Sequence, residues 1–216
     1  MEYSMKTREE IKQTARERLA GSRNSSIAVY FLALIAFGVL SAASLGLASL
    51  VLAPVIVVAS DGFFAAVYRG EGRTVSDWFS GMFDGFVRKW LGMFLMSLKV
   101  FLWSLLLVIP GIVKAMAYSL TPYILAEYPG VSAGDAARLS DKMTYGYKMD
   151  IFVAGLSFLG WEMLSALTFG LLEVFFAGPY RSITFGGIYE ELKRNAIERG
   201  TIREEELENG AEGTVY

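Results

Sequence analysis

The sequence contains no cysteine and no histidine among its 216 residues. Without cysteine, the chain has no disulfide, no thiolate metal ligand and no cysteine nucleophile. Without histidine, it lacks the commonest general base and the commonest protein metal ligand. Histidine-dependent catalytic triads and His-ligated zinc sites are therefore excluded, and the sequence predicts a protein that is not an enzyme, with no catalytic, cofactor-binding or metal site.

Charged residues are scarce and unevenly distributed. They make up 19% of the chain and hydrophobic residues 54%, whereas soluble domains average about 25% charged and about 45–50% apolar residues. The charges form clumps that are separated by long apolar runs. The formal net charge is −2, so the total charge gives no reason to expect a nucleic-acid partner.

Six apolar runs are long enough, or nearly long enough, to cross a membrane. A helix that crosses a hydrocarbon core of about 30 Å needs about 20 mostly apolar residues. A very apolar soluble bundle would need a polar stripe on each helix, and the first two runs have none. The sequence therefore predicts an all-α, polytopic membrane bundle of about six helices, arranged as three hairpins. The runs are Ile27–Ala43, Leu45–Val67, Trp90–Ile109, Ile112–Tyr128, Ile151–Phe169 and Leu171–Ile188.

The fourth run is short and contains Pro122, so a kinked or partly re-entrant fourth segment is an alternative to a full crossing. Lysine and arginine positions give the orientation. Seventeen of the 20 basic residues lie before the first run, after the second, after the fourth and after the sixth. The connections near Ser44, Pro110 and Gly170 are tight and nearly uncharged. Six spans would place all 17 on one side, which predicts that both termini lie in the cytoplasm.

The pattern divides the chain into three regions. Residues 1–24 are expected to form a basic amphipathic leader helix, residues 25–192 the transmembrane domain, and residues 193–216 an acidic tail that is mobile. The leader's basic residues favour anionic lipid headgroups, although a solvated helix that obeys the positive-inside rule explains them equally well. The lipid bilayer is the expected partner, and the pattern specifies neither a ligand nor an oligomeric state.

Two short segments between the runs are amphipathic. Residues 74–87 and 132–147 each begin with the residue spacing of a helix cap, Thr74 with Asp77 and Ser132 with Asp135. Both are expected to form helices in the cytoplasmic interface, and a helix packed on the end of the bundle is the alternative.

A threefold internal repeat is a further expectation. Each unit would be an amphipathic helix followed by a membrane hairpin whose second arm carries a proline. Proline removes a backbone donor and kinks a helix, so Pro54, Pro122 and Pro179 are candidate kinks. They follow Gly21, Gly85 and Gly146 by 33, 37 and 33 residues.

The second half of the sequence contains several recognisable stretches. They are Ile109-Pro110-Gly111, Tyr118-Ser119, Pro122-Tyr123-Ile124-Leu125-Ala126, Ala136–Ser140, Leu156–Trp161 and Pro179-Tyr180. Together they resemble the DUF975 family of prokaryotic membrane proteins. The sequence departs from the family at Tyr147, where a histidine is frequent, and at Glu162, where an apolar residue is usual. The resemblance implies a polytopic protein of the cytoplasmic membrane and no established activity.

Charged residues inside the runs are candidate functional residues, because a charge in a bilayer is expensive. The candidates are Asp61, Lys99, Lys114, Glu162, Glu173 and Arg181, and Glu127 is a further acidic residue in the fourth run. One interpretation is a polar path through the bundle for an ion or an anionic substrate, with Asp61 within reach of Lys99. The other is a set of buried ion pairs that fix the helix register, with Glu173 and Lys114 reaching the outer interface.

Three classes of function follow. A small transporter or channel-like protein is favoured by the intramembrane charges and the prolines. A non-catalytic membrane scaffold or assembly factor is favoured by the interfacial helices and the short outer turns. A membrane enzyme that acts on lipid or peptide ranks last, since no Ser–Lys pair has more than chance spacing.

Overall fold

The computed structural model describes residues 5–44 and 46–208, and every regular element in those ranges is helical. The predicted all-α class is thus confirmed. The helices in chain order are α1 (Arg8–Gly21), α2 (Arg23–Ala43), α3 (Leu47–Arg69), α4 (Val75–Phe83), α5 (Phe86–Leu106), α6 (Val108–Ala117), α7 (Thr121–Glu127), α8 (Ala133–Met143), α9 (Lys148–Leu156), α10 (Leu159–Leu167), the π-helical segment η1 (Glu173–Ala177), α11 (Gly178–Glu198) and α12 (Glu204–Glu208).

Local sequence determines where several helices begin and end. The side chain of Thr74 accepts a hydrogen bond from the backbone N–H of Asp77 and starts α4, and Ser132 caps α8 in the same way. Both predicted caps are confirmed. The helix expected over residues 74–87 ends at Phe83, because Gly85 adopts a left-handed conformation with φ 59° and turns the chain into α5.

Three helical segments are long and apolar enough to cross a membrane. They are Leu47–Arg69, Val108–Glu127 and Lys148–Leu167. The pair Arg8–Gly21 and Arg23–Val39, bent by 95°, adds a fourth if it is counted as one broken span. The second predicted run begins at residue 45, which lies outside the described ranges, as do residues 1–4 of the leader and 209–216 of the tail.

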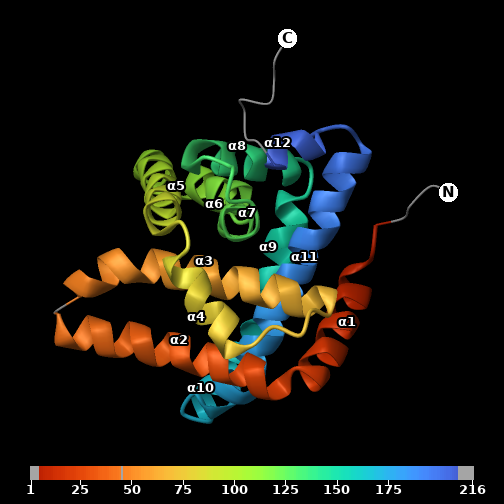
Figure 1. Ribbon diagram of the computed structural model, residues 1–216. Helices are drawn as coiled ribbons and strands as arrows, with labels where there is room; N and C mark the ends of the chain where they lie inside the picture. Colours follow the sequence, from red (N-terminus) through yellow and green to blue (C-terminus); the bar gives the residue numbers. More distant parts are fainter. Residues whose placement is uncertain (1–4, 45, 209–216) are drawn as a thin grey trace.

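Helix α3 is the centre of the arrangement (Figure 1). Helix α2 runs beside it, α5 and α7 pack on it from one side, and α11 packs across it. Helix α1 contacts both α3 and α11, so the first helix and the last long helix pack against the same central helix. Helices α3, α7 and α11, each in the second arm of a predicted hairpin, therefore lie together.

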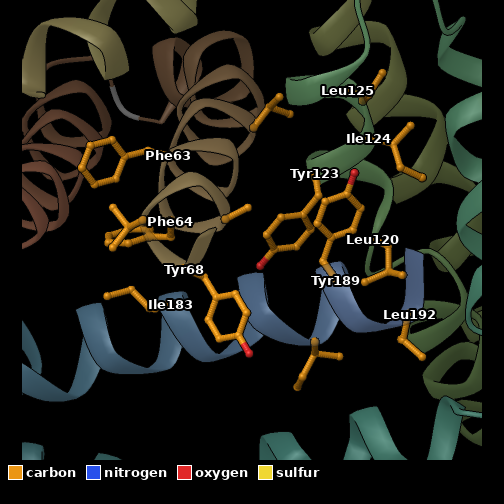
Figure 2. Packing of buried hydrophobic residues seen from close by; sticks show 14 of the residues in the cluster. Phe63, Phe64, Tyr68, Leu120, Tyr123, Ile124, Leu125, Ile183, Tyr189 and Leu192 are labelled. Carbon is orange, nitrogen blue, oxygen red and sulfur yellow. The ribbon is translucent and has the colours of Figure 1, made fainter. Parts of the chain in front are cut away.

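The core lies where α3, α7 and α11 meet (Figure 2). Tyr123 and Tyr189 stack with ring centroids 5.0 Å apart. Glycine allows α11 and α3 to approach each other closely, because a Cβ atom at Gly186 would lie 2.8 Å from the Cα of Ala65. A Cβ at Gly62 would likewise lie 2.5 Å from the Cβ of Ala126 on α7. Small residues at helix crossings are typical of membrane bundles.

Large apolar side chains cover much of the outer surface. They are densest at the three tight turns, where Leu47 is 70% exposed, Ile109 75% and Phe169 98%. Soluble monomers rarely expose contiguous apolar patches of more than a few hundred Å². This surface agrees with the helices that are apolar enough to enter a membrane.

The prolines occupy different places in their helices. Pro54 lies inside α3, and Pro179 follows η1 directly within one continuous helical stretch, residues 171–198. Pro122 lies in the first turn of α7, where proline is tolerated because the first-turn N–H groups have no partner within the helix. In the tail, α12 is folded against the rest of the chain and its Leu207 is fully buried, so this part is packed where the sequence predicts mobility.

Candidate functional site

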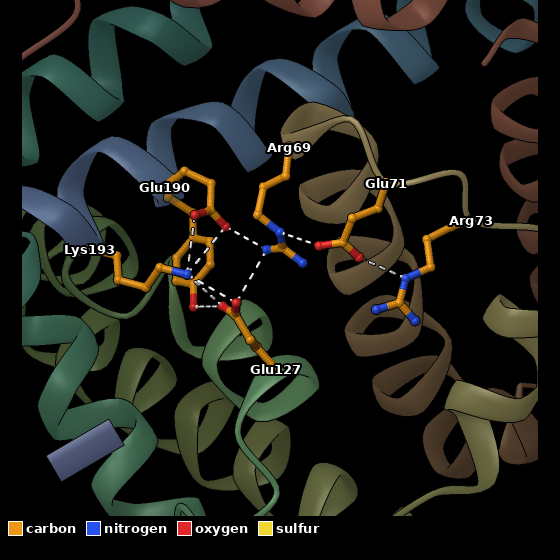
Figure 3. Close-up of polar contacts among 7 residues, drawn as sticks. Arg69, Glu71, Arg73, Glu127, Glu190 and Lys193 are labelled. Carbon is orange, nitrogen blue, oxygen red and sulfur yellow. Dashed lines mark hydrogen bonds and ion pairs between the residues drawn. The ribbon is translucent and has the colours of Figure 1, made fainter. Parts of the chain in front are cut away.

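The C-terminal ends of α3 and α7 meet α11 in a network of ion pairs (Figure 3). We call it the α3–α7–α11 network. Lys193 donates to both carboxylate oxygens of Glu127, at 3.0 and 2.9 Å. Arg69 donates to Glu127 at 3.3 Å and to Glu190 at 2.6 Å. Its members are Arg69, Glu71, Arg73, Glu127, Tyr189, Glu190 and Lys193.

The local fold brings these side chains together. Arg69 is the last residue of α3, and Gly70, with φ 91°, turns the chain so that Glu71 returns to accept a hydrogen bond from Arg69 at 2.6 Å. Glu190 and Lys193 are three residues apart on one face of α11. Tyr189 precedes them and donates its hydroxyl hydrogen to Glu127.

The charges of the α3–α7–α11 network balance, with three cationic side chains and three carboxylates. Burial lowers the pKa of Lys193, but the carboxylates of Glu127 and Glu190 outweigh it and hold that pKa above its ordinary value. Burial raises the pKa of Glu71, but hydrogen bonds from Arg69 and Arg73 outweigh it and hold that pKa below its ordinary value. Both shifts in pKa favour the charged forms of Lys193 and Glu71 near neutral pH.

A small cavity of about 120 Å³ lies beside the network. Its walls include Trp78, Lys89 and Glu127. Lys89 is buried and donates to the backbone carbonyl of Gly81 at 2.6 Å. The cavity has polar groups and enough room for a few water molecules or a small ion.

Three of the six predicted intramembrane charges come together in a second cluster. Arg181 donates to Glu162 at 2.5 Å and to Glu173 at 3.2 Å. Tyr30 of α2 donates to Glu173 at 2.7 Å. The cluster ties the tip of the last hairpin to α2, as expected for ion pairs that fix helix register.

The other predicted charges lie elsewhere. Lys114 donates to Asp141 of α8 at 3.1 Å, and Lys99 lies 5.6 Å from the ring centroid of Tyr118. Asp61, which the sequence places within reach of Lys99, has no hydrogen-bond or ion-pair partner among the described residues. The six side chains thus form one cluster of three, a pair of lysines beside Tyr118 and the single Asp61.

A Ser–Lys contact is also present, which the sequence analysis did not select. Lys12 donates to Ser157 Oγ at 2.6 Å, and burial, with the charges of Arg16 and Arg8, lowers the pKa of Lys12. However, the contact lies at the surface and Ser157 Oγ donates to the carbonyl of Ala154. A nucleophile needs its proton directed toward a base, so this geometry does not form a dyad.

The pairing of Asp141 with two lysines can be tested through the pH dependence of stability. Burial raises its pKa, but hydrogen bonds from Lys148 and Lys114 outweigh this and lower it. A carboxylate with a lowered folded-state pKa stabilises the fold above its unfolded pKa, about 3.9, and this stabilisation disappears as the pH falls through the folded pKa. We expect the melting temperature to fall more steeply below about pH 4 in the wild type than in Asp141→Asn. Parallel profiles between pH 7 and pH 3 would contradict this.

Sequence reasoning did not find the α3–α7–α11 network as a unit. The sequence places Glu127 within the fourth run, Glu190 just after the last run and Lys193 at the start of the tail. The partners on different helices are 58 or more residues apart. Only the Glu190–Lys193 spacing on one helix gave a local signal.

The comparisons with known proteins come to one match. Residues 93–196 match the family model described as "Protein of unknown function (DUF975)". The matched range contains Glu127, Glu190 and Lys193 and the whole Glu162–Glu173–Arg181 cluster. The resemblance predicted from the sequence is confirmed over this range. Neither the curated proteins nor the solved structures give a significant match.

Proposed function

Given the match of its second half to DUF975, we propose that this chain is a non-catalytic scaffold of the cytoplasmic membrane. Three membrane-inserted hairpins with six membrane-embedded arms form it, and both termini lie in the cytoplasm. The hairpins are α2–α3, α5–α7 and α9–α11. The observation that carries the scaffold role is the balanced α3–α7–α11 network, which joins the second arm of every hairpin and leaves no net charge for a substrate.

The membrane location and orientation are supported by two observations. The three turns between hairpin arms expose apolar side chains and carry almost no charge. Seventeen of the 20 basic residues lie in the other four segments. The shared order of amphipathic helix and hairpin supports a threefold repeat, which a superposition of the three hairpins tests.

A small transporter is the second candidate, and one observation favours it. The cavity of about 120 Å³ beside Lys89 is polar and adjoins Glu127. A transporter would need this cavity to connect with the remaining charges of the domain. Lys114 and Arg181 are instead held by their own carboxylate partners, which supports the scaffold.

The substitutions Lys99→Gln and Arg181→Gln separate the two functions. Arg181 bonds two carboxylates and Lys99 bonds none. We therefore expect Arg181→Gln to cost about 1–2 kcal/mol of stability, and Lys99→Gln to change it by less than about 0.5 kcal/mol. Thermal unfolding in detergent measures both.

The same proteins are reconstituted in liposomes, and K⁺, H⁺ and Cl⁻ fluxes are followed with entrapped dyes. A scaffold gives no flux above empty liposomes in the wild type or in either variant. Flux in the wild type that is lost in a folded Lys99→Gln or Arg181→Gln variant would favour the transporter and overturn the scaffold.

A further inference from the structure

Lys99 and Lys114 stand at one level on the two arms of the second hairpin. Their ammonium groups lie 5.6 and 5.4 Å from the ring centroid of the same residue, Tyr118. The hairpin between them, residues 100–113, contains no charged residue. The two lysines therefore mark a boundary between a charged base and an uncharged tip.

Helix α8 lies at the level of this boundary. Asp141 of α8 accepts hydrogen bonds from Lys114 at 3.1 Å and from Lys148 at 2.7 Å. Ser140 and Thr144 donate to the backbone carbonyl of Ala117, at 2.8 and 3.2 Å. These contacts fix α8 beside the lower part of both arms, and they fix Lys114 at its depth.

The outer side of α8 is charged and meets the acidic C-terminal helix. Arg138 and Lys142 line a cavity of about 520 Å³ together with Lys99. Lys142 donates to Glu206 of α12 at 3.0 Å, and Arg138 lies 3.8 Å from the same carboxylate. Placing such a charged surface in the hydrocarbon core would cost too much free energy, so it lies in water or among lipid headgroups. Lys99 and Lys114 then lie at the same depth as this surface, close to the headgroups.

The tip beyond the lysines is short and apolar. Fourteen residues give about seven per arm, or about 10 Å at 1.5 Å per residue, whereas the hydrocarbon core is about 30 Å thick. Most of its described side chains are exposed, with Leu107 68% exposed and Val108 71%. The tip is too short to reach the opposite surface while its base stays among charges.

We propose that the second hairpin is a wedge that enters only the cytoplasmic leaflet of the bilayer. The partner surface is one lipid monolayer: the uncharged tip lies among the acyl chains, and Lys99, Arg138 and Lys142 lie among the phosphates, where basic side chains are favoured. This inference rests on the proposed membrane location and replaces a crossing by the second hairpin with a re-entrant one. A crossing hairpin and a re-entrant hairpin both leave the two termini on the same side of the membrane.

The first hairpin has a much longer charge-free run than the second. Its charge-free run extends over residues 24–60, which is about 18 residues or 27 Å per arm. That length suits a full crossing. The hairpins therefore differ in depth, although they share an order of elements.

The absence of cysteine allows a direct test. Val108→Cys places one thiol at the wedge tip, and Gly134→Cys places one on α8, where a Cβ meets no atom within 4 Å. Intact spheroplasts and inverted membrane vesicles are treated with a membrane-impermeant maleimide. We expect Val108→Cys to react in neither preparation and in detergent only, and Gly134→Cys to react in inverted vesicles. A nitroxide at position 108 in liposomes should then report a depth within one leaflet.

Two outcomes would overturn the wedge. Labelling of Val108→Cys in spheroplasts would show that the hairpin crosses the membrane, and labelling in inverted vesicles would show that the tip lies in water. If the protein is not embedded in the membrane at all, alkaline carbonate will release the wild type from membranes. That result would overturn the proposed membrane location and is distinct from the labelling results that would overturn the wedge.

Discussion

Replacing Gly186 with leucine is expected to separate α11 from α3 and to cost about 3 kcal/mol or more of stability. A Cβ at this position would lie 2.8 Å from the Cα of Ala65 and 2.9 Å from its backbone nitrogen. Backbone atoms of a helix cannot move aside as the end of a flexible side chain can. The two helices must therefore move apart, which also weakens the contacts around Tyr189. Thermal unfolding in detergent measures the loss.

The matched control is Gly134→Leu on α8. A Cβ at Gly134 meets no atom within 4 Å, and leucine is a better helix former than glycine by roughly 0.5–1 kcal/mol. We expect this variant to be as stable as the wild type or slightly more stable. Equal melting temperatures for the two leucine variants would show that the α3–α11 crossing does not depend on a glycine.

Replacing Glu127 with glutamine is expected to cost about 2–4 kcal/mol. Glutamine keeps the size of the side chain and still accepts the hydrogen bond from Tyr189. It removes the negative charge that Lys193 and Arg69 share. Because Lys193 is largely buried, with 13% of its side chain exposed, its charge would keep only Glu190 as a partner.

Glu205→Gln provides the control for Glu127→Gln, since Glu205 is exposed on α12. A surface change of this kind shifts stability by no more than about 0.5 kcal/mol. Melting temperatures of the two variants in the same detergent give the comparison. If Glu127→Gln has the same melting temperature as Glu205→Gln, the network has no structural role. The main support for the scaffold would then be lost.

Local rules predicted much of the secondary structure. The caps at Thr74 and Ser132 depend on residues three positions apart, and the structure contains both. The apolar runs fall largely on helices, as expected for apolar segments of about twenty residues. The interruptions within the runs were not predictable in detail. A turn at residues 118–120 separates α6 from α7, and η1 precedes α11, and both depend on the packing of neighbouring helices.

The candidate sites show where sequence reasoning ends. Glu162, Glu173 and Arg181 were selected as costly charges, and they do meet because they flank one hairpin tip. Lys114 was expected at the outer interface because it follows the turn at Pro110-Gly111. The structure pairs it with Asp141 of α8, 27 residues later. No one-dimensional pattern contains that contact.

The crossing of α11 over α3 has a consequence for biosynthesis. Arg69 and Ala65 emerge from the ribosome long before Glu190 and Gly186, which are their partners in the fold. Until the last fifth of the chain is made, Arg69 lacks Glu190, one of its three carboxylate partners, and the surface of α3 around Ala65 is not covered by α11. Contacts between distant parts of a chain form late, and chains that stall before α11 should be substrates for membrane proteases.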